Sequence, residues 1–303
     1  MDPTLQPYVD GMLGSLVLQT LLTGFHCIIF FQTLIPIIRK GHQKVYATAL
    51  TALFGAVIVN LGCTWLTVRN AFVVKNNSQE SIAAHLPVFS PALETINVFS
   101  AFIAIFTADL ILVSRCYIVC ARSNIVLYLF AFLCIGEIVL VFIPTIQAAK
   151  TPHLSIWASG PIFYSVSLVI TILATLIIIL RITFISRKGG GGLSRYSYIM
   201  EVLVESGILY AAPLMVTVIF IVMTRNYITE SDGPIIKAMD YLTGIITPMT
   251  GIAPTLIAFR VATGRARSES SWSQPLSALH FRSTVYDSMH TDTVDGHTTT
   301  SNV

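Results

Sequence analysis

Four acidic side chains lie within strongly apolar stretches of this sequence, where an ionised carboxylate is costly. They are Asp109, Glu137, Glu201 and Glu205. An acid in such a setting binds a cation, pairs with a basic group or stays protonated, so each is a candidate for function. A satisfied hydrogen bond between two helices would account equally well for any one of them.

Asp109 and Glu137 are the most deeply placed of these acids within their apolar segments. The neighbours of Glu137 are otherwise apolar, so burial predicts that it is protonated at rest unless it is paired. Gly136 beside it could allow a close contact with another helix. We predict an intramembrane polar network that contains Asp109, Glu137, Asp240 and Tyr210.

Glu201 and Glu205 are one turn apart, which places them on one face of a helix. Two like charges repel there unless a cation lies opposite, and Arg115 is at a similar depth; Arg181 is a second candidate. The spacing predicts a latch in which Arg115 bridges to Glu205, with Glu201 beside it. Alternatively, Glu201 reaches interfacial water and only Glu205 is buried.

The last apolar segment begins with a second charged pair, Lys237 and Asp240, whose spacing of three predicts an ion pair along one helix. Lys237 lies too near the start of this segment to resemble a retinal-binding lysine. Three prolines interrupt the sixth and seventh segments, and we expect Pro213, Pro248 and Pro254 to kink or loosen these helices.

These residues are carried by seven apolar segments, each longer than the roughly 20 residues that cross a bilayer core. The segments are approximately 11–38, 45–68, 92–118, 125–146, 161–184, 196–223 and 235–262. Hydrophobic residues make up 54% of the 303 residues and charged residues only 11%, which is typical of the membrane class. The expected fold is an all-α membrane protein, a seven-transmembrane helix bundle.

Positive charge predicts how the bundle is oriented. Thirteen of the 18 Lys and Arg residues flank the segments on one side, which the positive-inside rule assigns to the cytosol. The N-terminus, residues 1–10, is then a short extracellular segment, and residues 11–262 form the transmembrane domain. A glycosylation sequon at Asn76 lies in the longest loop of the outer side. The Ser/Thr-rich residues 263–303 are predicted to be a disordered cytosolic tail.

Several function classes lack their motifs. Of the seven histidines only His26 lies in an apolar segment, so no intramembrane metal site can be assembled from histidine. There is no nucleophile elbow and no phosphate-binding loop. We therefore expect no catalytic residue, no metal and no cofactor, and no basic patch indicates a nucleic-acid partner.

Three groups of residues resemble a large family of seven-helix, receptor-like proteins of mushroom-forming fungi over nearly the whole membrane portion. They are Thr107–Asp109 with Arg115–Tyr117, Glu205–Ser206 with Leu209–Tyr210, and Gly251–Ile257 with Arg260–Val261. The resemblance implies the architecture but no ligand or activity.

The likeness to G-protein-coupled receptors is looser. Arg115-Cys116-Tyr117 resembles the acidic-Arg-Tyr end of the third receptor helix, but Ser114 stands where the acid would be. The Asn-Pro-x-x-Tyr pattern of the seventh helix is absent, since Ala253 precedes Pro254.

Two functions from different classes remain open at this point. The first is a plasma-membrane receptor that senses a small-molecule or peptide ligand and acts on a heterotrimeric G protein. It is favoured by the Arg115 motif, the flexible Gly189–Gly192 loop and the phosphorylatable tail together. The alternative is a transporter or lipid-handling protein in which Asp109, Glu137 and Glu205 line a proton or cation path.

Overall fold

The computed structural model confirms the predicted all-α bundle and describes residues 6–40, 44–75, 81–82, 90–120, 122–150, 160–188, 194–224 and 233–272. Within these ranges there is no β-strand. The helices are α1 (Gln6–Lys40), α2 (Lys44–Arg69) with its π-helical extension η1 (Asn70–Val74), α4 (Pro91–Val119), α5 (Asn124–Lys150), α6 (Gly160–Lys188), α7 (Ser194–Thr224) and α8 (Gly233–Trp272).

Seven of these helices are long and apolar enough to cross a membrane. Their outward faces carry large apolar side chains. On α1 these recur every three or four residues and are Leu13, Val17, Leu21, Phe25, Ile28, Phe31, Ile35 and Ile38. A stripe with this spacing covers one face of a helix, and here that face would meet lipid tails. The chain is a multi-pass integral membrane protein.

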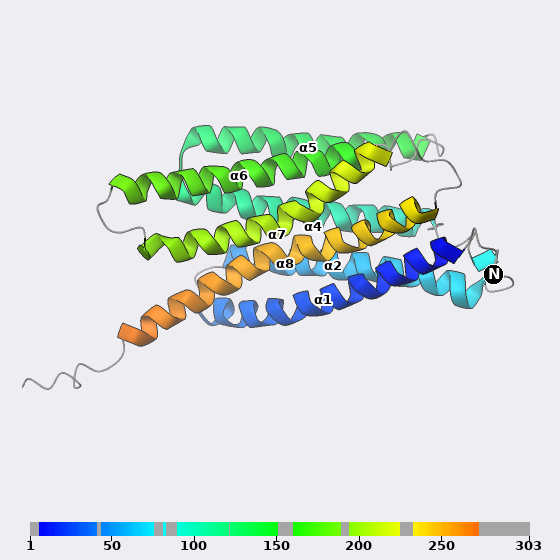
Figure 1. Ribbon diagram of the computed structural model, residues 1–303, viewed down its shortest axis with the longest axis horizontal. Coiled ribbons are helices and arrows are strands. Elements are labelled where there is room, and N and C mark those ends of the chain that lie inside the picture. Colours follow the sequence, from blue (N-terminus) through cyan, green and yellow to red (C-terminus); the bar gives the residue numbers. More distant parts are fainter. Residues whose placement is uncertain are drawn as a thin grey trace, which may run out of the picture. The chain divides into compact units, whose positions relative to one another are not determined.

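Helix α4 lies inside the bundle and positions much of the site described below. It packs between α2 and α6, and α5 covers α4 and α6 from another side (Figure 1). Helix α1 packs on α2, and α7 packs on α6. The start of α4 is fixed by Ser90, whose Oγ accepts a hydrogen bond from the Leu93 amide at 3.4 Å, and by Pro91 at its first position.

Helix α8 is the most enclosed of the seven spans. Its membrane window, Lys237–Arg260, is 67% buried and has the lowest mean hydropathy of the seven, 1.5. A helix surrounded by other helices can carry more polar and small residues than one that faces lipid. This explains why α8 contains buried threonines, glycines and prolines.

Small residues let α1 and α8 approach closely. A Cβ atom on Gly14 would overlap the ring of Tyr241, and one on Gly244 would overlap the Ser15 hydroxyl. Ser15 Oγ also donates a 2.6 Å hydrogen bond to the Asp240 carbonyl. Close backbone approach of this kind replaces the hydrophobic driving force that is missing between helices in lipid.

The helices differ from the sequence predictions at both ends of the chain. Helix α1 already begins at Gln6, and Asp10 near its start pairs with Lys237 of α8. Helix α8 continues to Trp272, so the predicted disordered tail, 263–303, begins as helix. Residues 1–265 form one compact unit and 266–303 a second, of which only 266–272 are described.

The prolines, the loops and Gly136 bear on the other predictions made for these segments. Helices α7 and α8 continue as helix through Pro213, Pro248 and Pro254, and the kinks stay a prediction. Asn76, the loop 189–192 and residues 273–303 lie outside the described residues. The prediction that Gly136 allows a close helix contact is wrong, because a Cβ atom there would meet nothing within 4 Å.

Candidate functional site

A hydrogen-bonded cluster centred on Asp109 joins three helices inside the bundle. Ser167 Oγ from α6 donates to Asp109 Oδ2 at 2.6 Å, and the Tyr210 hydroxyl from α7 lies 3.1 Å from Ser167 Oγ and 3.4 Å from Asp109 Oδ1. Thr171 Oγ1 is 3.4 Å from Asp109 Oδ1 but makes its shorter bond, 2.9 Å, to the Ser167 carbonyl. Asp109, Ser167 and Thr171 are fully buried.

The geometry gives this cluster a direction. The hydrogen of Ser167 goes to Asp109, so the single hydroxyl hydrogen of Tyr210 goes either to Ser167 or directly to Asp109. In both cases the chain of donors ends at the carboxyl group. Hydroxyl donors of this kind favour the ionised form of an acid, whereas burial without a basic partner favours its protonated form. Asp109 is therefore the acceptor at the end of a hydroxyl relay that begins on α7.

Glu137 adds a second carboxyl group from α5. It is fully buried and near enough to Asp109 for the two carboxyls to interact electrostatically. Neither Glu137 oxygen, however, has a partner at hydrogen-bonding geometry among the described residues. Buried polar atoms without partners are rare and mark either a functional role or a missing ion or water. The structure thus brings Asp109, Glu137 and Tyr210 together, as predicted.

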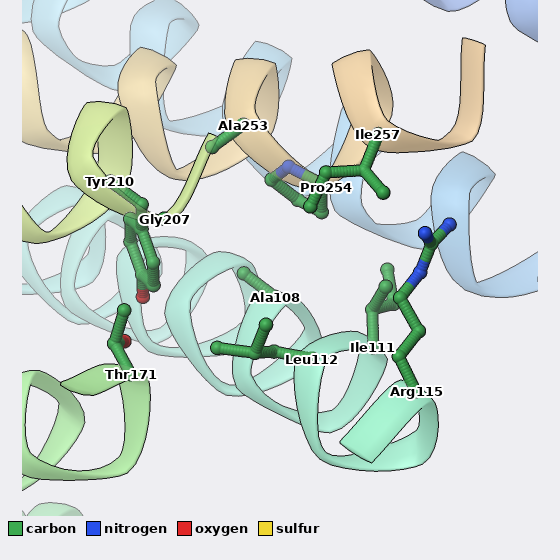
Figure 2. A pocket seen from close by; sticks show the side chains of 10 residues that line it. All are labelled: Ala108, Ile111, Leu112, Arg115, Thr171, Gly207, Tyr210, Ala253, Pro254 and Ile257. Atoms are coloured by element: carbon green, nitrogen blue, oxygen red, sulfur yellow. The ribbon is translucent and has the colours of Figure 1, made fainter. Parts of the chain in front are cut away.

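A narrow pocket of about 20 Å³ extends from this cluster toward Arg115, between α4, α6, α7 and α8. Figure 2 shows Tyr210 and Thr171 near one another at one end of this pocket and Arg115 at the other. Apolar side chains line the stretch between them and include Leu112, Pro254 and Ile257. A volume of this size holds about one water molecule.

Arg115 is held from α2. Its Nη2 donates to the Tyr46 hydroxyl, and its guanidinium lies 5.2 Å from the centroid of the Tyr46 ring. Its Nε is buried and has no partner among the side chains that the structure describes. The predicted latch partners, Glu201 and Glu205, have side chains outside the described ones, so the bridge between α4 and α7 stays a prediction. The partner that sequence reasoning missed is Tyr46.

No protein-family model, curated protein or solved structure matches this chain.

Asp240 does not belong to the Asp109 cluster, contrary to the prediction. It lies in the α1–α8 contact near Gly11 and Ser15, and its buried Oδ2 has no partner within the described part of the chain. The predicted pair between Lys237 and Asp240 is also wrong. Lys237 Nζ pairs with Asp10 of α1 instead, at a site where both side chains are substantially exposed. Lys237 pairs with Asp10 and not with Asp240 because α1 approaches α8 closely at this point.

A chain of amide side chains links α1, α2 and α4 and was not predicted from the sequence. Gln19 Nε2 donates to Asn60 Oδ1 at 2.9 Å, and Asn60 Nδ2 donates to Asn97 Oδ1 at 2.7 Å. Ser100 Oγ donates to the Asn97 carbonyl at 2.8 Å. The signal that could have revealed it is the presence of Asn or Gln in each of the first three apolar segments: Gln19 and Gln32, Asn60, and Asn97.

Replacing Asn60 by Ala is expected to destabilise the bundle, because Gln19 and Asn97 lose their shared partner. Interhelical hydrogen bonds in membranes contribute about 0.6 kcal/mol each, so a loss of about 1 to 2 kcal/mol follows for two. Thermal unfolding of the purified protein in detergent measures it. The control is Thr51→Ala, which removes an exposed hydroxyl bonded only within its own helix. Equal melting temperatures for the two variants would contradict the role of Asn60.

His26 forms a third buried polar site, between α1 and α8. Its Nε2 is 3.2 Å from Thr255 Oγ1, and the Thr255 hydroxyl donates to the Gly251 carbonyl at 2.7 Å. Because that hydrogen is already used, His26 Nε2 must donate, which leaves Nδ1 as a buried acceptor with no partner in the described ranges. The Phe54 ring packs against His26 with centroids 5.4 Å apart. This setting suits a neutral histidine that fixes the position of α8.

Proposed function

We propose that this chain is a seven-helix, receptor-like signalling protein of the plasma membrane, with its N-terminus outside and its basic end in the cytosol. The observation that carries the proposal is the placement of Asp109 and Arg115 on one helix, α4. Asp109 binds α6 and α7 through Ser167 and Tyr210, and Arg115 binds α2 through Tyr46. The fold agrees with the resemblance to the fungal receptor-like family.

The proposed mechanism is a shift in how α7 packs against α4 and α6. An external ligand, a small molecule or a peptide, biases the hydrogen bonds that end at Asp109. Because α4 is continuous from Asp109 to Arg115, a change at the cluster alters the contact between Arg115 and Tyr46 at the cytosolic end. The narrow pocket lies between α4, α7 and α8, so the proposed shift of α7 away from α4 would widen it. A free Arg115 is then available to a heterotrimeric G protein.

A transporter that moves protons is the second candidate, and Glu137 is the observation in its favour. An acid with two unpartnered oxygens beside another acid can accept and release a proton. The pocket beside the cluster holds about one water molecule, which favours protons over larger solutes. Proton flux into liposomes that is lost with Glu137→Gln would support this candidate over the receptor.

Nucleotide exchange on a fungal Gα subunit tests the receptor. Tyr46→Phe removes the hydroxyl that holds Arg115 and is expected to raise basal exchange several-fold, whereas Arg115→Ala is expected to abolish it. Membranes with matched expression of each variant provide the comparison. Tyr128→Phe is the matched control, because Tyr128 is exposed on α5. Exchange that is absent in every variant, or equally raised by Tyr128→Phe, would overturn the proposal.

A further inference from the structure

The cluster around Asp109 is built entirely from oxygen-bearing side chains. Asp109 from α4, Glu137 from α5, Ser167 and Thr171 from α6, and Tyr210 from α7 contribute two carboxyls and three hydroxyls. Their residues are 0–5% exposed. Carboxyl and hydroxyl oxygens without nitrogen or sulfur are the donor set that hard cations prefer.

The same cluster lacks a compensating positive charge. Neither Asp109 nor Glu137 is paired with a basic side chain among the described residues. Arg115 is six residues further along α4, or about 9 Å along the helix axis, and it is already bound to Tyr46. A buried charge without a partner is costly, and the usual solutions are an ion pair or a bound metal ion.

Glu137 supplies the second observation. Its two oxygens are buried, lie beside Asp109 and have no hydrogen-bond partner among the described groups. In a water-filled site such oxygens would be solvated, but this one is enclosed by four helices. Unpartnered oxygens that lie beside a second carboxyl group are suited to a positive ligand shared between the two groups.

We propose that Asp109 and Glu137, together with the hydroxyls of Ser167 and Tyr210, bind one monovalent cation of the size of Na⁺ in the middle of the bundle. The charge favours a monovalent ion, because two neighbouring buried carboxyls do not both ionise readily and the pair then offers one negative charge. A bound cation ties α5 to α4, α6 and α7, which the hydrogen bonds do not do. This site does not depend on the receptor function, and its test involves no signalling.

The test uses the purified full-length chain in detergent, in mildly alkaline buffer. Chloride is kept constant while choline is replaced by sodium, and thermal unfolding and the binding of radioactive sodium are measured. The wild type is expected to unfold at a higher temperature in sodium and to bind about one ion per chain, since a ligand of the folded state stabilises it. Asp109→Asn is expected to lose the sodium-dependent shift and to bind at least about tenfold more weakly, because fewer charged ligands remain.

Asp240→Asn is the matched control. Asp240 also has a buried oxygen without a partner, but it lies in the α1–α8 contact, so its variant is expected to keep the sodium response. Should Asp109→Asn fail to fold, Glu137→Gln and Ser167→Ala supply the comparison. Sodium binding by the wild type tests the site without any variant. Equal unfolding in sodium and choline, an unchanged response in Asp109→Asn, or stabilisation by Ca²⁺ alone would overturn the site.

Discussion

The Gly251→Ala variant is expected to unfold at a markedly lower temperature than the wild type. A Cβ atom at this position would overlap Cε1 of His26 and would lie 2.7 Å from its Nδ1. The ring cannot move aside easily, because it is fully buried, packed against Phe54 and bonded to Thr255. Overpacking of this kind costs about 1 to 3 kcal/mol. Thermal unfolding in detergent measures the loss.

Gly136→Ala is the matched control for this substitution. A Cβ atom at Gly136 meets nothing within 4 Å, and Ala favours a helix over Gly by up to about 1 kcal/mol. Its melting temperature should therefore equal or exceed that of the wild type. Combining Gly251→Ala with His26→Ala should recover part of the loss by removing the ring. If Gly251→Ala melts like Gly136→Ala, the close packing of α1 against α8 is wrong.

Gly136 and Gly251 show that the sequence predicts the membrane spans but does not predict which glycine lies in a close helix contact. Apolar length predicted all seven spans, because the cost of unsatisfied backbone in lipid leaves few alternatives to helices. The same reasoning assigned a close helix contact to Gly136, whereas the close contacts are at Gly14, Gly244 and Gly251. Which face of a helix meets a neighbour depends on its rotation, and a nearly uniform apolar sequence carries little information about rotation.

The candidate site was predictable in part for the same reason. Burial cost alone identifies Asp109 and Glu137, since an acid within an apolar segment must face the bundle interior. Their partners are contributed by helices far away in the sequence: Ser167 is 58 residues from Asp109, and Thr255 is 229 residues from His26. The prediction for Lys237 at the start of α8 was wrong for a similar reason. Its spacing of three from Asp240 suggested a pair within α8, whereas its partner in the structure is Asp10 of α1.

The two buried acids of the cluster are expected to affect stability in opposite directions. Asp109→Ala removes the acceptor at the end of the hydroxyl relay, leaving Ser167 with a lost bond in a fully buried site. Glu137→Met removes a carboxyl group that has no hydrogen-bond partner and keeps an unbranched side chain. Each substitution is expected to change the free energy of unfolding by about 1 to 3 kcal/mol, the usual penalty for an unsatisfied buried polar group. Thermal unfolding in sodium-free detergent buffer should show a lower melting temperature for Asp109→Ala and a higher one for Glu137→Met.

Ile135→Met controls for the new methionine, because Ile135 is on the same helix, α5, with an exposed side chain, and it should leave the melting temperature unchanged. A Glu137→Met variant that is destabilised as much as Asp109→Ala would mean that Glu137 holds α4 and α5 together without any ion. A variant that is stabilised but inactive in nucleotide exchange would instead identify Glu137 as a residue that lowers stability for the sake of function. That combination is expected where a fold keeps an unpartnered acid in its interior, since local stability and activity conflict most often at functional sites.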